Sequence, residues 1–153
     1  MIPEELGANP VAAALADIAT TGKLAYGQLT IEVGPADILE ALRRMKHDLG
    51  FERLSTVTAV DRYPAEPRFE VVYHLQSIAK KQWLRLKARV PGVNPEIESA
   101  FAVYRSANWY ERETYDLFGI RFLNHPDLRR IMMPEDWPGH PLRKDYPVTG
   151  ERY

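Results

Sequence analysis

Three carboxyl side chains occur close together in the segment NWYERETYDLFG, residues 108–119. Glu111, Glu113 and Asp116 could supply a general acid and a general base, because their surroundings can shift the pKa values of neighbouring carboxyl groups in opposite directions. Possible ion-pair partners are also available: Arg112, Arg121, Arg129 and Arg130. Because ion pairing explains these acids without catalysis, we expect them to be structural and assign no catalytic residue.

Two histidines, His125 and His140, flank a segment that also contains Asp127, Glu135 and Asp136. Nitrogen and oxygen ligands of these types can bind zinc or another divalent metal. Their spacing matches no compact ligand motif such as HExxH, so we expect ordinary hydrogen-bonded histidines and no metal or cofactor site. A free-standing hydrolase or metal enzyme that uses His125 and His140 stays open as an alternative.

Glycine-rich and serine motifs of common active sites are missing from the sequence. There is no GxSxG, GxGxxG or GxxxxGK[ST] pattern, so a serine nucleophile, a dinucleotide site and a phosphate loop have no support. Arg129-Arg130 and Arg143-Lys144 could bind phosphates, but acids are interleaved with them and the formal net charge of the chain is -1. Since a nucleic-acid groove is normally more one-sided in charge, we expect no nucleic-acid partner and keep an RNA-binding module only as an alternative.

Contact with another protein is the function that this region fits best. Arginines and acids alternate with Trp109, Trp137 and several tyrosines, which is the composition of a charge-complementary, aromatic-anchored interface. Proline also limits the conformational freedom that a segment loses when it docks. The same features would suit a tail that wraps its own domain, and the sequence pattern leaves both interpretations open.

The composition is that of one ordinary globular domain. Hydrophobic residues make up 45% and charged residues 27% of the 153 residues, and no apolar run is long enough to span a membrane. The chain has no cysteine, which excludes disulfides, thiol nucleophiles and cysteine-bound iron–sulfur clusters. The start MIPEELGANP lacks the pattern of a cleaved signal peptide, so we expect the cytoplasmic side.

The pattern of elements in the first half predicts helices and antiparallel strands. Asn9-Pro10 is typical of a helix start, and we expect a peripheral N-terminal helix that ends at Gly22. A strand at 28–33 and an amphipathic helix at 38–50 follow. Three alternating strands are expected next: 52–62, 68–77 and 82–90. Their polar outer faces indicate antiparallel pairing with one face on the core.

Two more helices and a tail are predicted in the second half. Asn94-Pro95 repeats the helix-start pattern, and residues 108–119 form a separate helix that Gly119 closes. From Arg121 to Pro147 no period lasts and five of the chain's 12 prolines occur, yet apolar side chains are frequent, so this segment should lie against a surface.

Together the elements predict an α+β fold, a two-layer sandwich of a mostly antiparallel sheet with helices on one face, followed by an extended proline-rich C-terminal tail. The expected divisions are 1–22 for the peripheral helix, 23–120 for the α+β core domain and 121–153 for the docking tail. No repeat or low-complexity segment interrupts this order.

Four motifs in the last third of the chain resemble the signature of a known family. ERETYDLFGIRF, HPDLRRIMM, PEDW and GHPLRKDYP occur in this order. They are similar to the 30-kDa subunit of respiratory complex I, which is the C subunit of the bacterial proton-translocating NADH:quinone oxidoreductase. The preceding segments, from GQLTIEV to SANWYERE, are in an order similar to that family as well.

The resemblance implies a scaffold subunit of the peripheral arm that binds no flavin, cluster or quinone itself. FMN, iron–sulfur clusters and quinone would be bound by other subunits, and the whole complex would pass electrons from NADH to quinone coupled to proton translocation. The partners would be the D subunit, which is the large subunit of the quinone pocket, and neighbouring peripheral-arm subunits. The chain would lie on the cytoplasmic side of the inner membrane, associated with it only through the complex.

The signature residues would organise the tail or meet the partner: Trp109, Glu111, Arg112, Glu113, Asp116, His125, Pro126, Arg129, Arg130, Trp137, His140, Arg143 and Lys144. The four charged residues from 111 to 116 would be ion-pair organisers, His125 and Arg129-Arg130 would fix the path of the tail, and the last four residues would anchor docking. A related alternative keeps the fold and changes the complex, because membrane-bound hydrogenases, archaeal reduced-cofactor dehydrogenases and the ferredoxin-using photosynthetic complex contain a homologous subunit. The sequence does not distinguish these electron donors.

Overall fold

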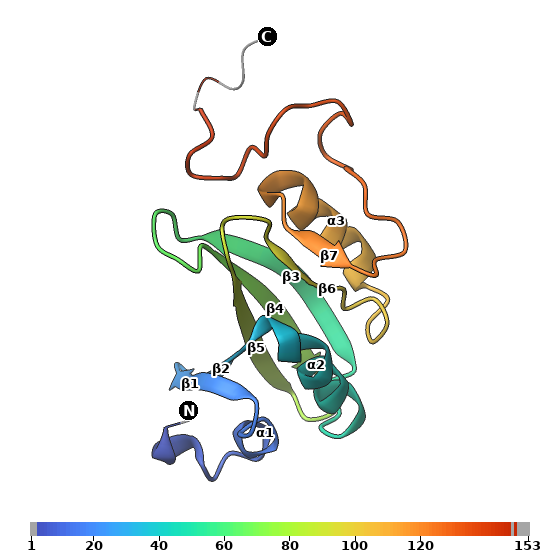
Figure 1. The fold of residues 1–153 in the computed structure, drawn as a ribbon. Helices are drawn as coiled ribbons and strands as arrows, with labels where there is room; N and C mark the ends of the chain where they lie inside the picture. Colours follow the sequence, from blue (N-terminus) through green and yellow to red (C-terminus); the bar gives the residue numbers. More distant parts are fainter. Residues whose placement is uncertain (1–2, 148, 150–153) are drawn as a thin grey trace.

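A five-stranded sheet forms the centre of the molecule in the computed structural model, which describes residues 3–147 and 149 (Figure 1). The strands are β1 (Ala19–Ala25), β2 (Gln28–Val33), β3 (Arg53–Asp61), β4 (Phe69–Ser77) and β5 (Gln82–Val90). They lie in the order β1-β2-β5-β4-β3, and every neighbouring pair is antiparallel except the parallel pair of β2 and β5. The prediction of a mostly antiparallel sheet in an α+β fold is confirmed.

Two helices cover one face of this sheet (Figure 1). α2 (Ile38–His47) follows a 3-10 turn at Pro35–Asp37, and its buried side chains join the same hydrophobic core as the inward side chains of the strands. α3 (Ala107–Phe118) packs against β3, where the Thr114 hydroxyl donates a hydrogen bond to the Val57 carbonyl. Both helices were expected from the sequence, because amphipathic periodicity is a local property.

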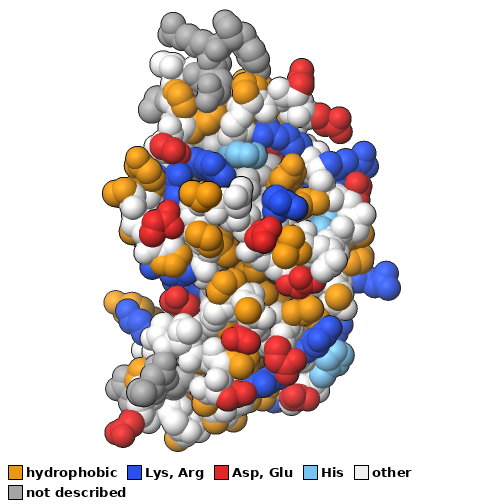
Figure 2. Space-filling view, in the orientation of Figure 1, with side chains coloured by type: hydrophobic (Ala, Val, Ile, Leu, Met, Phe, Trp, Pro, Cys, Tyr) orange, Lys and Arg blue, Asp and Glu red, His pale blue; other side chains and the backbone are white. Residues whose placement is uncertain are grey.

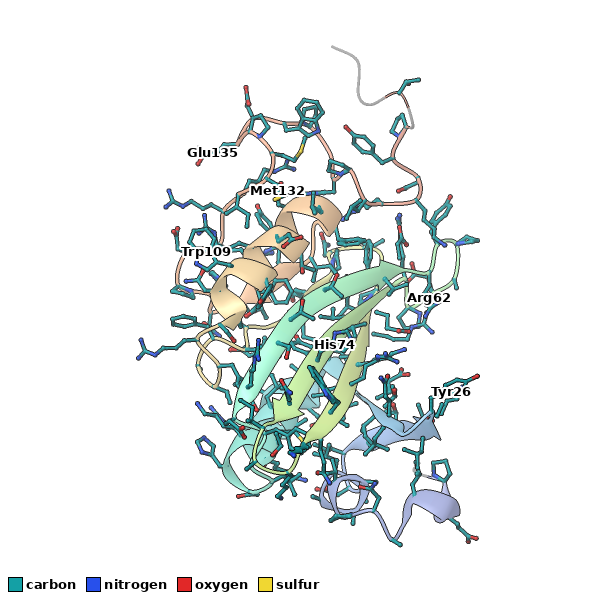
Figure 3. All side chains as sticks on the ribbon, turned by 180° about the vertical axis from the view of Figure 1, so that it is seen from behind. Tyr26, Arg62, His74, Trp109, Met132 and Glu135 are labelled. Atoms are coloured by element: carbon teal, nitrogen blue, oxygen red, sulfur yellow. The ribbon has the colours of Figure 1, made fainter. Side chains whose placement is uncertain are left out.

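The alternation along each strand determines which of its side chains are buried. The inward residues of β4 and β5 are all in the core: Phe69, Val71, Tyr73, Leu75, Leu84, Leu86, Ala88 and Val90. The side chains between them, such as His74 and Arg85, point to the other face, which no helix of the described residues covers (Figure 3). One face of the sheet is therefore covered by helices and the other, called the open face, is not, although Glu70 and Val72 of β4 are buried there too.

The N-terminal segment differs from the prediction. Asn9 caps a helix as expected, since its side-chain oxygen accepts hydrogen bonds from the backbone N–H groups of Val11 and Ala12 at 3.0 and 3.3 Å. The helix α1 (Pro10–Ala14) is short, however, and the predicted continuation to Gly22 is wrong, because β1 pairs with β2 there. A boundary at residue 22 would fall inside β1.

Close packing explains why a glycine stands at position 22. A Cβ atom on Gly22 would lie 3.2 Å from a methyl carbon of Ile31 and 3.3 Å from one of Leu6. Leu6, Val11 and Leu15 are buried in the core. The N-terminal segment was expected to be peripheral, but it is part of the core. Gly22 resembles a helix end in the sequence, but its role is to let β1 approach its neighbours.

The predicted helix after Asn94-Pro95 is also wrong. Asn94 has a left-handed backbone with φ of 49°, and the following residues form the short strand β6 (Glu96–Glu98). This strand pairs in parallel with β7 (Arg121–Leu123), which buries Ile97 against Phe122. The partner strand lies beyond α3 in the sequence, so a local helix-start pattern was overruled by a distant pairing.

Residues 124–147, called the tail from here on, form no helix or strand in the described structure. The first three residues of the segment predicted as extended belong to β7 instead. In Figure 1 the tail runs around α3. Its path is set by the hydrogen bonds described next.

Candidate functional site

The C-terminal end of α3 is the point where the tail is fastened. Gly119 ends the helix with φ of 78°, as the sequence predicted, and its N–H donates to the Tyr115 carbonyl at 2.8 Å. The last carbonyl groups of a helix have no partner within it and must be satisfied from outside. A Cβ atom at Gly119 would lie 2.6 Å from atoms of both His140 and Arg143, so the tail packs directly over this glycine.

Three tail groups satisfy the exposed carbonyls of α3. His140 Nδ1 donates to the Asp116 carbonyl at 2.9 Å, the backbone N–H of Leu142 to the Leu117 carbonyl at 3.0 Å, and Arg143 Nε to the Phe118 carbonyl at 2.6 Å. The Arg143 cation also lies at the negative end of the helix dipole, where positive charge is stabilising. The tail therefore acts as the C-terminal cap of α3.

Asp116 holds a second part of the tail. Its carboxylate is fully buried, and Oδ2 accepts hydrogen bonds from three consecutive backbone N–H groups, those of Ile131, Met132 and Met133, at 3.2, 2.7 and 2.9 Å. Arg130 Nε lies 3.6 Å from Oδ1. A buried charge of this kind needs several polar partners, and here the tail backbone supplies most of them.

The hairpin between β3 and β4 provides a third fastening point, which was not predicted from the sequence. Arg68 Nη2 lies 2.8 Å from Asp61 and 2.7 Å from Asp145 of the tail, and the backbone N–H of Lys144 donates to Asp61 at 2.8 Å. Asp61 and Arg68 are both buried. The available signal was an acid and an arginine near the facing ends of two predicted antiparallel strands.

Glu111 does not have the ion-pair role that was expected. Its buried carboxyl group accepts hydrogen bonds from the Ser99 hydroxyl at 2.9 Å and the Ala100 backbone N–H at 3.0 Å, and no cation pairs with it among the described residues. Burial raises the pKa of Glu111 to about 8, against the two hydrogen bonds, which favour the ionised form. This side chain ties α3 to the loop after β6.

Glu111→Gln is expected to change the pH dependence of folding. Since the folded protein keeps the Glu111 proton up to a pKa of about 8 while the unfolded chain loses it near 4.5, the wild type loses stability as pH rises between these values. The slope contributed by one such group reaches about 1.4 kcal/mol per pH unit. Urea unfolding measured from pH 5 to 8.5 should show that the free energy of unfolding of the glutamine variant rises relative to that of the wild type. If the two proteins have the same pH dependence, the raised pKa of Glu111 is contradicted.

Arg112 and Glu113 also lack the expected ion pairs. Arg112 donates from Nε to the Arg129 carbonyl at 3.2 Å, and its guanidinium lies 4.6 Å from the centre of the Trp109 ring. Glu113 is exposed and forms no hydrogen bond or salt bridge among the described residues. Of the four charged residues, only Asp116 has a salt bridge in the described part of the chain.

The two histidines that suggested a metal site are held separately. His125 accepts at Nδ1 from the Asp127 backbone N–H at 2.9 Å, and its Nε2 lies 3.1 Å from the Asn108 carbonyl. Burial lowers the pKa of both His125 and His140. Within residues 3–147 no three histidine, aspartate or glutamate side chains are grouped so that they could bind a metal.

The remaining signature residues lie along the tail. Arg129 pairs with Asp127 at 3.0 Å on the surface, and Pro126 is exposed. Trp137 is partly buried and donates from Nε1 to the Tyr146 hydroxyl at 3.1 Å, whereas the side chain of Lys144 is exposed and only its backbone is bound to Asp61. The structure thus brings Asp116, Arg130, His140 and Arg143 together and leaves Glu113, Pro126 and Arg129 at the surface.

Large apolar side chains remain exposed around this fastened tail. Trp109 is 63% exposed on α3, and in the tail Met132 is 63% and Leu142 52% exposed. Figure 3 shows Trp109, Met132 and Glu135 at the same end of the molecule, and Tyr26 at the other. An ordered segment that keeps its apolar side chains outward is suited to contact with another protein.

Comparison with known proteins places this arrangement in a family. Residues 31–152 match the family described as respiratory-chain NADH dehydrogenase, 30 Kd subunit. The chain belongs to this family. The resemblance found in the sequence is confirmed.

Bacterial relatives of the 30-kDa subunit family share about half of their residues with this chain. The C subunit of NADH-quinone oxidoreductase from Citrifermentans bemidjiense is 52% identical over 124 residues, which is 81% of this chain and 77% of the relative. The C subunit from Geobacter sulfurreducens is 51% identical over 125 residues, with the same coverage of 81% and 77%. These relatives are named as subunits of an oxidoreductase complex.

Solved structures of two related proteins share the fold. The trypsin-resistant fragment of Nqo5 has a TM-score of 0.69 and 30% identity, over 77% of this chain and 96% of the fragment. A chain of the membrane-bound sulfane sulfur reductase, an archaeal respiratory membrane complex, has a TM-score of 0.79 and 29% identity, over 93% of this chain and 86% of that chain. The same fold therefore occurs in a second respiratory complex.

Proposed function

We propose that this chain is a non-redox scaffold subunit of the peripheral arm of a proton-translocating NADH:quinone oxidoreductase. In this proposal its tail and the exposed side of α3 dock onto the D subunit, the large subunit of the quinone pocket. The complex would transfer electrons from NADH through FMN and iron–sulfur clusters to quinone, with proton translocation. Other subunits would bind these groups, and the chain would lie on the cytoplasmic side of the membrane, attached through the complex.

The observation that supports docking most directly is the way in which the tail is ordered. Asp116, the end of α3 and the Asp61–Arg68 pair hold it by its backbone and polar groups. This leaves Met132 and Leu142 outward although they are large apolar side chains. A tail that only wrapped its own domain would gain free energy by burying them instead.

The charge pattern of the surface agrees with a protein partner. Figure 2 shows basic and acidic side chains interspersed with hydrophobic ones over the face that is turned to the viewer. Nucleic-acid binding normally uses a surface dominated by positive charge. No helix in the described part of the chain has the length and the apolar character to cross a bilayer.

Met132→Asp is expected to lower the recovery of the D subunit about tenfold or more, because it would place a charge in an apolar contact. The measurement is a pull-down of the tagged chain from its native membranes in mild detergent, with co-purified subunits quantified by mass spectrometry. Tyr26→Asp is the matched control, because Tyr26 is fully exposed and lies away from the tail (Figure 3). Equal recovery with both variants would refute docking through the tail.

A subunit of a related complex is the alternative that a specific observation supports. The likeness to a chain of the sulfane sulfur reductase shows that this fold also serves a different respiratory complex. The same pull-down distinguishes the two, because NADH- and flavin-binding subunits would co-purify only with a NADH:quinone oxidoreductase. Hydrogenase-like partners would change the complex and leave the scaffold role in place.

A further inference from the structure

The open face of the five-stranded sheet contains a cation without a carboxylate partner. Both helices lie on the opposite face, and Figure 3 shows His74 in the middle of the uncovered one. Arg85 of β5 stands between His74 of β4 and Thr30 of β2, since it is paired with both in the strand register. The inward neighbours of Arg85 are fully buried, so the position of its backbone is firmly fixed.

Neutral groups are the only partners of Arg85 within the described structure. Its Nε donates to His74 Nε2 at 3.3 Å, and its Nη2 lies 3.5 Å from the side-chain oxygen of Gln28. Burial and the nearby charges of Arg85 and Lys87 lower the pKa of His74, which favours the neutral ring that can accept this hydrogen bond. No carboxylate of the described residues pairs with the Arg85 guanidinium on the open face.

Three other cations of this face have a partner within the chain. Lys87 pairs with Glu70 at 2.8 Å, and Arg62 lies 3.4 Å from the same carboxylate. Arg89 donates to the Pro67 carbonyl.

Lys23 of β1 and Arg53 of β3, which the strand register places on the same face, are exposed at the two edges of the sheet and have no hydrogen bond or salt bridge among the described residues. Arg85 differs from Lys87 and Arg62 because it has no carboxylate partner, and from Lys23 and Arg53 because it lies on the central strand of the sheet.

A shallow hollow lies beside Arg85. It has a volume of about 380 Å³ and is lined by Gln28, Leu29, Ser55, Thr56, His74, Trp83, Leu84 and Arg85. The Trp83 side chain is 52% exposed at its edge. Tryptophan and arginine next to each other are the side chains that contribute most often to the energy of protein interfaces.

We propose that this open face, centred on Arg85 and Trp83, is a second protein-docking surface. Its partner is an acidic segment of another subunit of the complex, which presents a carboxylate to Arg85 and an apolar side chain to the hollow. The surface lies on β2, β3, β4 and β5 and is distinct from the tail and α3. A nucleic acid fits less well, because Glu32 and Glu70 interrupt the positive charge of this face, whereas a phosphate backbone needs a continuous positive surface.

Cross-linking in the intact complex tests this surface. A benzophenone amino acid is placed at position 83, in the complex purified from native membranes, and irradiated. We expect one covalent product with another subunit, in which the cross-linked peptide contains aspartate or glutamate. R85E in the same chain should lower the yield of this product about tenfold or more, whereas R85K should retain most of it.

R43E is the matched control. Arg43 lies exposed on α2, on the helical side of the sheet, and forms no hydrogen bond or salt bridge among the described residues. Its charge reversal should leave the yield unchanged. If R85E prevents the isolated chain from folding, as judged by its Tm, R85Q removes the charge with a smaller perturbation and gives the same comparison.

Several results would overturn the proposal. They are the absence of any product with another subunit, a product with a second copy of this chain, a cross-linked peptide without an acid, and equal yields for R85E and R43E. One further result would support the proposal. In this result the R85E chain folds normally but does not enter the complex, whereas the R43E chain does. The tail variant Met132→Asp changes a different surface. The two variants therefore test docking through the tail and docking through the open face separately.

Discussion

Replacing Asp61 by alanine is expected to lower the free energy of unfolding by about 3–5 kcal/mol, because a buried charge is left without its main partner. Arg68 is only 7% exposed and donates to both oxygens of Asp61, from Nε at 2.9 Å and Nη2 at 2.8 Å. The backbone N–H groups of Tyr63 and Lys144 donate to the same carboxylate and would also lose their acceptor. Urea unfolding at pH 7 measures the loss.

A surface salt bridge provides the control for this variant. Asp17 lies 2.6 Å from Arg44, but its side chain is 62% exposed, so Asp17→Ala should change the free energy of unfolding far less than Asp61→Ala does. If Asp61→Ala lowers the free energy of unfolding as little as Asp17→Ala does, the ion pair with Asp145 alone is enough to stabilise Arg68. Arg68 also holds the pKa of Asp61 well below its ordinary value, so the stabilisation is present above about pH 4 and is lost as the pH falls further.

Asp116→Ala should release the tail without unfolding the domain. The variant removes the acceptor of three consecutive backbone N–H groups and the charge that Arg130 faces. Hydrogen bonds to a charged acceptor contribute about 1.5–3 kcal/mol each, but the freed tail can open to water, which limits the cost. We expect a local loss of about 3 kcal/mol, seen as roughly hundredfold faster amide exchange at Ile131, Met132 and Met133.

Glu113→Ala is the control on the same helix. Glu113 is exposed and has no hydrogen bond or salt bridge among the described residues, so amide exchange in the tail should stay unchanged. Protection of the core strands β4 and β5 should be the same in both variants. Fast exchange throughout the sheet in Asp116→Ala would mean that the tail is part of the folding unit, contrary to this expectation.

We propose that the chain has two docking surfaces, one formed by the tail with α3 and the other by the open face of the sheet. In our proposal the tail contacts the D subunit on one side of the molecule and the sheet face receives an acidic segment on another. A small domain with two docking surfaces can fix the relative position of two larger subunits. Neither surface needs a redox group in this chain.

Elements with local patterns were predicted well. The alternation of β4 and β5, the periodicity of α2 and the glycine at the end of α3 each depend on neighbouring residues, and the structure has them as expected. The family signature was also recognisable, because its four motifs lie close together in the sequence. Local order in the chain was enough for these conclusions.

Elements that depend on distant partners were predicted poorly. β1 and β6 lie where helices were expected, since their hydrogen bonds go to β2 and to β7. Glu111 was expected to pair with a cation because arginines are near it in the sequence, but its partners are Ser99 and the backbone of Ala100. Nearness in sequence does not determine which groups meet in a folded core.

The sequence by itself determined the fold class, the order of most elements, the absence of common catalytic motifs and the membership of the family. Only the tertiary structure decided how the tail is held, because its contacts join residues as far apart as Asp61 and Lys144. It also decided that Arg85 faces an open side of the sheet without a carboxylate. Both properties arise from long-range packing, which fixes the neighbours of a charge and so determines whether that charge is satisfied within the chain.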